Sequence, residues 1–293
     1  VLPSLPDWNP LAAIYHSPSI PVEKLVGRGV DILITGEPGS GRTTALVYLV
    51  YHLLTTNQDN REEKTPLPVL AHAADLNLTG SEKDILKILL QAVQQPVSFT
   101  GFRKISALIT RKIQQGEAVL LLDGLDEIPL RSQQALAAFI REIKNSYPDI
   151  QVLAAGEPRQ LDLYHDTGLI PAPAAPWTSH DFVQFTQRWS RAWKKHIAPR
   201  LPRRLTDIDP TLINAWLQPT LTGLTPLETT LRTWSAYAGD LNSTALHEVY
   251  QAYIRRMLSP PDQKAAEQLA IAWISDYLGD DQKLTADRDT LTE

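Results

Sequence analysis

The stretch "ILITGEPGSGRTTAL", residues 32–46, constrains the fold most, because it joins an apolar strand to a helix through a glycine-rich turn. The run "VDILIT" leads into the turn, and "TTALVYLVYHLLTT" follows it with a helical pattern. A short β-branched run of this kind is typical of a strand that is buried in a parallel sheet. We therefore predict a parallel β-sheet with helices packed against it.

The alternation of strands and helices continues along the chain as far as about Trp177. Further strands are predicted at 67–76, 118–129 and 150–158, and further helices at 81–95, 105–116 and 132–147. Strands that alternate with helices form right-handed βαβ units, so the sheet should be mostly parallel and covered by helices on both faces. The expected fold class is α/β.

After Trp177 the pattern becomes entirely helical, with Ser179 as the expected cap of the first helix. We expect four parts: a proline-rich lead-in (1–28), a nucleotide-binding domain (29–176), a helical domain (177–260) and a truncated further domain (261–293). The chain starts without Met and stops soon after a helical pattern, so we expect it to be a fragment of a longer protein.

The turn itself, "GEPGSGRT", fits the phosphate-binding pattern GxxxxGK[ST] except that Arg42 stands where the pattern has lysine. Glycines in such a turn let backbone N–H groups surround phosphates, the following helix offers its positive N-terminus, and the Thr43 hydroxyl can bind Mg²⁺. An ordinary strand-to-helix turn is the alternative. The predicted phosphate-binding residues are Gly36, Glu37, Pro38, Gly39, Ser40, Gly41, Arg42, Thr43 and Thr44.

A second motif, "VLLLDGLDEIP", places acids directly after an apolar strand. Such a strand delivers Asp123 to the edge of a parallel sheet where ligands bind. We predict that Asp123 binds Mg²⁺ together with Thr43, and that Glu127, with Asp126 beside it, is the catalytic group that polarises the attacking water. A solvated turn or a helix cap is the alternative explanation of these acids.

Together the two motifs resemble the Walker A and Walker B signatures of NACHT-type members of the STAND class of P-loop NTPases. The resemblance rests on "LLLDGLDE" and "ITGEPGSGRTT" and covers roughly residues 29–275. It implies bound ATP or ADP with Mg²⁺, a P-loop NTPase fold, and nucleotide-controlled assembly into homo-oligomers that serve effector and sensor domains outside this fragment.

The resemblance also assigns downstream residues. The family's sensor strand ends in an arginine, whereas "LAAGEPRQ" has Glu157 there and Arg159 two residues later. Pro226 in "GLTPL" matches a proline that packs on adenine in the family, although a proline at the first turn of a helix is an equal alternative. The segment from 261 would be the start of a winged helix.

Arginine at position 42 keeps the positive charge of lysine but is broader and planar. We expect nucleotide binding to be retained, and hydrolysis to be slow because catalysis depends on charge placement to within about an ångström. A pseudo-ATPase scaffold, which holds a nucleotide permanently or binds none, stays open as an alternative.

A stretch without acids, from Phe182 to Thr206, carries seven arginines and lysines with Trp189 and Trp193 among them. A nucleic-acid surface, as in an AAA-type ATPase acting on nucleic acid, is the less favoured explanation, because a solvated helix whose tryptophans face the core also fits. The net charge of -5 argues against a surface built wholly for nucleic acid. No apolar run reaches the ~18 residues of a membrane span, and we expect a cytoplasmic protein.

Overall fold

The computed structural model describes residues 19–59, 65–78, 84–94, 99–200, 210–221, 223–239 and 245–279. The chain divides into two compact units, Val1–Ala175 and Pro176–Glu293. Most of the proline-rich lead-in and the end of the expected winged-helix segment lie outside the described residues, as does Ser81 at the predicted start of the helix at 81–95.

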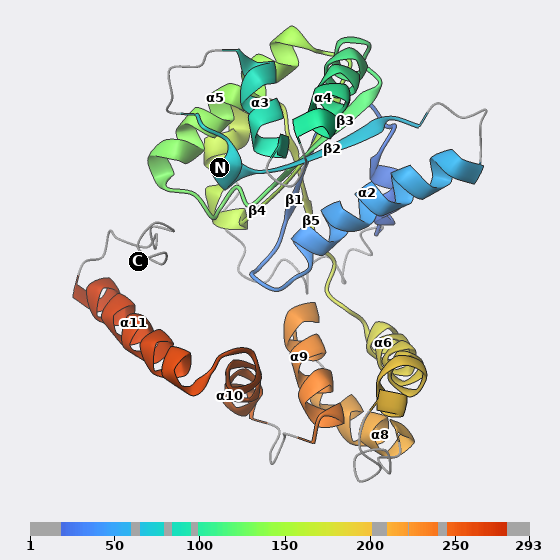
Figure 1. Cartoon of the computed structure of the whole chain (residues 1–293), viewed down its shortest axis with the longest axis vertical. Coiled ribbons are helices and arrows are strands. Elements are labelled where there is room, and N and C mark those ends of the chain that lie inside the picture. The colour runs from blue at the N-terminus through green and yellow to red at the C-terminus, as the bar shows by residue number, and fades with distance from the viewer. Residues whose placement is uncertain are drawn as a thin grey trace. The chain divides into compact units, whose positions relative to one another are not determined.

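The first unit contains a five-stranded sheet in which every pairing is parallel and the strand order is β2-β3-β4-β1-β5 (Figure 1). Its strands are β1 Ile32–Thr35, β2 Leu67–His72, β3 Ala118–Asp123, β4 Gln151–Gly156 and β5 Ile170–Pro173. The predicted α/β P-loop fold is confirmed. The strand predicted at 67–76 ends earlier, at His72, because Ala73–Asp75 turns into a short 3-10 helix, η2.

Helices cover both faces of this sheet. They are η1 Val22–Leu25, α2 Arg42–Asp59, α3 Ile85–Gln94, α4 Phe99–Gln114, α5 Leu130–Ser146 and η3 Pro158–Thr167. Leucines of α2 pack on one face, and α3, α4 and α5 pack on the other. Strand β3 lies inside the sheet and all six of its residues are buried, so both of its faces need apolar side chains.

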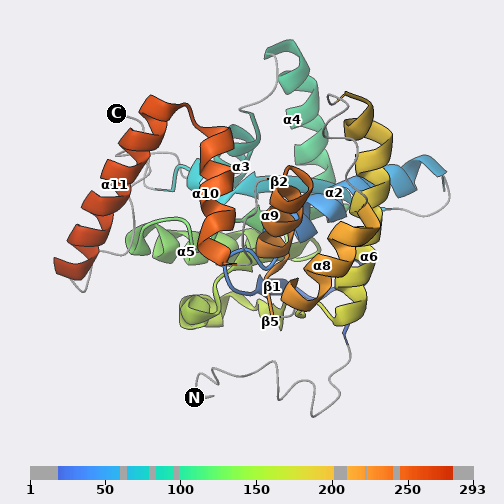
Figure 2. The same ribbon diagram turned by 90° about the horizontal axis from the view of Figure 1, so that it is seen from below.

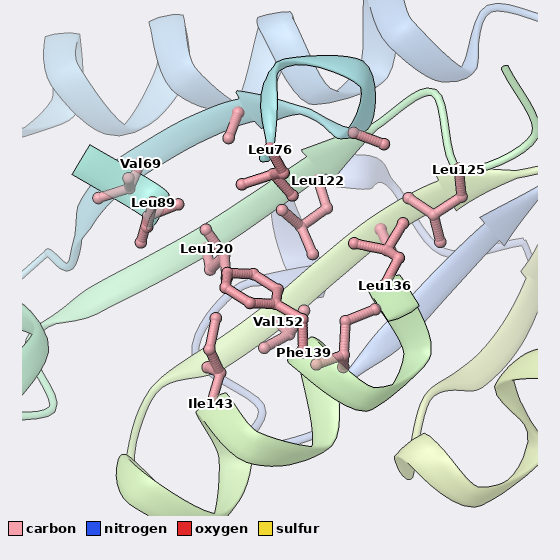
Figure 3. Close-up of a cluster of buried hydrophobic side chains, with 14 of the residues drawn as sticks. Val69, Leu76, Leu89, Leu120, Leu122, Leu125, Leu136, Phe139, Ile143 and Val152 are labelled. Atoms are coloured by element: carbon pink, nitrogen blue, oxygen red, sulfur yellow. The ribbon is translucent and has the colours of Figure 1, made fainter. Parts of the chain in front are cut away.

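Alternate residues of β3 point into two separate cores, as the two-residue period of a strand requires. Leu120 and Leu122 join the cluster with Leu136 and Phe139 of α5 (Figure 3). Val119 and Leu121 join the cluster of α2 on the opposite face. The apolar run before Asp123 therefore anchors β3 on both faces of the sheet. This packing fixes the position of Asp123 at the carboxyl end of the strand.

Strand β5 is the element that the sequence did not predict. Its sequence, "IPAP", carries Pro171 and Pro173, which usually argue against a strand. It pairs with β1 as the last strand of the sheet, where the N–H groups of Ile170 and Ala174 donate to Asp31 and Thr35. Because the prolines alternate with these donors and β5 is an edge strand, the ladder loses no bond to them.

The second unit is helical throughout its described residues (Figure 2). Its helices are α6 Ser179–Ala192, the π-helix η4 Trp193–Ile197, η5 Ala198–Arg200, α8 Pro210–Leu221, α9 Pro226–Tyr237, α10 Leu246–Met257 and α11 Pro260–Gly279. The cap predicted at Ser179 is wrong by one residue. Thr178 caps α6 instead, in a reciprocal capping box with Asp181, because its hydroxyl accepts from the Asp181 N–H.

Among the described residues, no helix combines the length and the apolar character that crossing a membrane requires.

Candidate functional site

The glycine-rich turn between β1 and α2 has the backbone conformation of an anion-binding loop. Gly39 and Gly41 have φ values of +84° and +94°, which side chains of L-residues rarely tolerate. The Gly36 position is also restricted, since a Cβ atom there would lie 2.5 Å from the Ser40 Oγ. The Ser40 N–H donates to the Glu37 carbonyl at 3.0 Å and closes the turn. Turns with left-handed residues at alternate positions are typical of anion-binding loops.

Helix α2 begins at Arg42, directly at the end of this loop. The first intrahelical bond outside the loop runs from the Ala45 N–H to the Gly41 carbonyl at 2.8 Å. The earlier N–H groups of the first turn, those of Arg42, Thr43 and Thr44, have no acceptor within the helix. These donors and the positive end of the helix dipole favour a phosphate at this position.

Two polar atoms of the loop, Ser40 Oγ and Arg42 Nη1, are buried without a hydrogen-bond partner among the described residues. Buried polar atoms are almost always paired, because an unmade hydrogen bond costs about 1–3 kcal/mol. A donor-rich loop with two unsatisfied polar atoms suits a ligand that carries several acceptor oxygens. The residues present therefore fit a polyphosphate.

The acids lie at the carboxyl end of β3, in the loop that follows it. Asp123 ends the strand, and Gly124 turns the chain with a φ of +69°. A Cβ atom at Gly124 would overlap the imidazole of His72, so only glycine fits there. Leu125 then inserts completely into the core and donates its N–H to the Ala155 carbonyl at 3.1 Å. Because Leu125 is held in the core, Asp126 and Glu127 lie on the loop beside the strand ends.

The structure brings the two sequence motifs into direct contact. The Thr43 Oγ1 donates to the Asp123 Oδ1 at 3.2 Å. The Arg42 Nη2 donates to the Asp126 Oδ2 at 2.9 Å, and these two side chains are only 12% and 13% exposed. Mg²⁺ takes one or two protein oxygens and completes its shell with water and phosphate oxygens, so the Thr43 and Asp123 oxygens fit it.

The formal charges of the site are unbalanced. Arg42 contributes one positive charge, whereas Asp123, Asp126 and Glu127 each carry a carboxylate. A divalent cation would offset the excess negative charge before an anionic ligand enters.

His72 is a site residue that the sequence did not identify. It ends β2 in register with Asp123 of β3, and its Nε2 lies 3.2 Å from the Glu127 Oε2. The Glu127 side chain is 61% exposed, so water reaches it. The sequence could have indicated His72 in one way. Neighbouring parallel strands end at the same edge of a sheet, so a histidine that ends one strand lies beside an acid that ends the next.

Tyr164, in η3, is a second residue near the site that sequence patterns did not reveal. Its side chain is buried, and its hydroxyl donates a long hydrogen bond, 3.5 Å, to the Leu125 carbonyl. Burial raises the pKa of Tyr164 strongly, and the nearby Asp126 charge raises this pKa further. The phenol is therefore a neutral donor close to Asp126.

Two further candidates were predicted from the sequence. Glu157 directly follows β4 and is half-buried. Pro226 belongs to the second unit, where it occupies the first position of α9 behind the cap Thr225. That position accounts for the proline by helix geometry alone. A contact of Pro226 with adenine stays a prediction.

The tryptophans of the basic stretch face the interior of the second unit. Trp193 packs edge-on against Tyr237 at 5.2 Å, and Trp189 packs against Phe185 at 5.7 Å. Arg188, Arg191, Lys194, Lys195 and Arg200 are exposed. The stretch thus offers exposed charges, while these aromatic rings are already engaged in packing.

A parallel sheet, a glycine-rich anion loop at the start of a helix, and an acid at the end of a buried strand two positions away in the sheet define a P-loop nucleotide-binding domain. The comparison with protein families agrees, because the model of the AAA domain matches residues 31–164. Residues 31–164 therefore have a P-loop NTPase fold and are similar to the AAA domain.

Solved structures with a similar arrangement include C. elegans PCH-2 (TM-score 0.43, 15% identity), Drosophila ORC bound to DNA (0.42, 14%) and the Aeropyrum pernix ORC1 protein in complex with DNA (0.40, 14%). The matches cover 84%, 88% and 84% of this chain and 66%, 63% and 62% of those chains, so it spans less than two thirds of each. Similarity at this level carries no information about function. No curated protein matches the sequence.

Proposed function

We propose that the first unit binds ATP or ADP together with Mg²⁺ and hydrolyses ATP slowly. The observation that carries this proposal is the contact between Thr43 and Asp123, 3.2 Å between their oxygens. This contact joins residues 80 positions apart and supports a shared cation site at the edge of the sheet. A chance glycine turn would lack this acidic partner.

In the proposed mechanism the loop holds the phosphates through the first-turn N–H groups of α2, with the Arg42 guanidinium as the side-chain cation. Thr43 and Asp123 hold Mg²⁺, which when bound supplies charge neutralisation for the phosphate oxygens. Glu127 accepts the proton of the attacking water as general base. His72 contacts one Glu127 oxygen and so leaves the other to face that water.

We propose further that the module is a nucleotide-controlled switch of the STAND and NACHT kind. The sequence "LLLDGLDE" supports this, as does the partly buried ion pair between Arg42 and Asp126, which keeps the Arg42 guanidinium from full contact with phosphate. In this proposal ATP favours a homo-oligomer, and effector and sensor domains outside residues 1–293 respond to that assembly. Slow hydrolysis would prolong the ATP-bound state.

Replacing Thr43 with Val should lower the affinity for MgADP about ten-fold, because the isosteric side chain cannot bind the cation. Affinity measured in EDTA should not change between the two proteins. Isothermal titration calorimetry gives both values. The matched control is T55V in the same helix, since the Thr55 hydroxyl bonds only to helix carbonyls in the described structure. Equal MgADP affinity in wild type and T43V would contradict the proposed cation site.

One observation keeps a second function open, namely the five exposed basic residues of α6, η4 and η5. They would contact the phosphates of a nucleic acid, without base stacking on the packed tryptophans. If this surface binds DNA, the triple variant R188E/R191E/K195E should abolish an anisotropy shift that wild type shows with labelled duplex at low salt. No shift for wild type at low salt would exclude this function.

A further inference from the structure

Arg42 and Asp126 form an ion pair that is almost closed to solvent. The Nη2 and Oδ2 atoms are 2.9 Å apart, and the side chains are 12% and 13% exposed. One charge comes from the first residue of α2 and the other from the loop after β3, so the pair links the phosphate loop to the acidic loop. A pair in this environment is screened by water far less than a surface pair.

The ion pair satisfies only part of the guanidinium. The Nη2 bonds to Asp126, whereas the buried Nη1 has no acceptor in the part of the chain that the structure describes. A guanidinium binds best when it donates two parallel hydrogen bonds to one anion. Asp126 therefore satisfies only part of the Arg42 guanidinium. An anion with more acceptor oxygens can replace Asp126 as the partner of Arg42.

We propose that Asp126 is an internal counter-ion of Arg42 that occupies the guanidinium in the nucleotide-free protein, competes with nucleotide phosphate for it, and so sets the nucleotide affinity of the site. This role rests on the proposed nucleotide-binding function. It makes Asp126 a positioning residue that acts through Arg42, in place of the catalytic role that its sequence position suggested.

The Asp126 carboxylate needs another hydrogen-bond donor once Arg42 binds phosphate. A buried carboxylate without a partner would be costly and would oppose the exchange. The Tyr164 hydroxyl lies near Asp126, and its present bond to Leu125 is long, 3.5 Å. In this proposal the Tyr164 hydroxyl, which bonds to the carbonyl directly before Asp126, is the donor for the released carboxylate.

The substitution D126N tests the role, because the side chain keeps its shape and an acceptor oxygen but loses its charge. We expect D126N to bind MgADP about ten-fold more tightly than wild type by calorimetry at low ionic strength. The matched control is D149N, which changes the net charge equally at an exposed position. Its affinity should equal that of wild type.

A double-mutant cycle separates a counter-ion of Arg42 from simple repulsion of phosphate by Asp126. If Arg42 is the partner, the increase in MgADP affinity caused by D126N should be smaller in an R42Q background than in wild type. An equal or larger gain in that background would show general repulsion and overturn the proposal. Circular dichroism and thermal unfolding of each variant establish that it is folded.

Should D126N fail to fold, Y164F provides the second test. Loss of the phenol hydroxyl should weaken MgADP binding about three-fold, because the released carboxylate loses its donor. Unchanged affinity in Y164F would then overturn the proposal. If wild type binds MgADP but D126N binds no more tightly, only the counter-ion role fails. If wild type binds no nucleotide at all, the proposed function fails and the counter-ion role fails with it.

Discussion

Replacing Glu127 with Gln is expected to lower the rate of ATP hydrolysis by about 10²–10⁴-fold, the usual contribution of a general base. Glutamine keeps the size of the side chain and can still contact His72, but it cannot accept a proton from water. The exposed Glu127 side chain makes no core contact that this change would disturb. Because hydrolysis is expected to be slow, phosphate release is best measured under single-turnover conditions with excess protein.

The affinity for MgADP should stay the same in E127Q, since Glu127 holds neither phosphate nor cation in the proposed mechanism. E142Q on the exposed surface of α5 is the matched control and should hydrolyse ATP like wild type. Hydrolysis by E127Q at the wild-type rate would show that another group activates the water. If wild type binds MgADP but releases no phosphate, the pseudo-ATPase scaffold is the correct description.

The substitution Leu121→Ala should lower the free energy of unfolding by about 2.7–5.0 kcal/mol. Leu121 is completely buried in the central strand β3 and contributes to the core between the sheet and α2. Removing its side chain loses apolar burial and leaves a cavity between elements that cannot close it, because the strand is hydrogen-bonded on both sides. Urea denaturation followed by circular dichroism gives the value.

Leu130→Ala is the control for this measurement, because Leu130 lies in the same unit and its side chain is 58% exposed. Its effect should be below about 0.5 kcal/mol. A loss below about 1 kcal/mol in L121A would mean that β3 is not packed from both sides, and the position of Asp123 would then need another explanation.

Much of the first unit could be predicted from local patterns. The apolar run before Asp123 and the glycine-rich turn before α2 each dictate their structure within a few residues, because strand burial and positive φ are local requirements. Strand β5 could not be found in this way. Its prolines have a low propensity for strands and argue against one. They are accepted only because β5 is an edge strand that pairs with β1 alone.

Some residues of the candidate site could likewise be predicted from local patterns, and others could not. The sequence predicted a phosphate loop, Asp123 and Glu127 as site residues, and the structure places Thr43 and Asp123 in contact. The partner of Arg42 was not predictable, since Asp126 reaches it only through the Gly124 turn and the buried anchor Leu125. His72 was missed because its role depends on the register between β2 and β3.

The sequence by itself determined an α/β chain with an anion loop and an acidic strand end, because each of these follows from short runs of residues. Only the tertiary structure decided which charges neutralise one another. Arg42 keeps the charge of the usual lysine, yet the fold pairs that charge with Asp126 in a nearly closed environment. A charge that is already paired attracts a nucleotide differently from a free one, and this pairing depends on distances across the sheet edge that no local sequence pattern encodes.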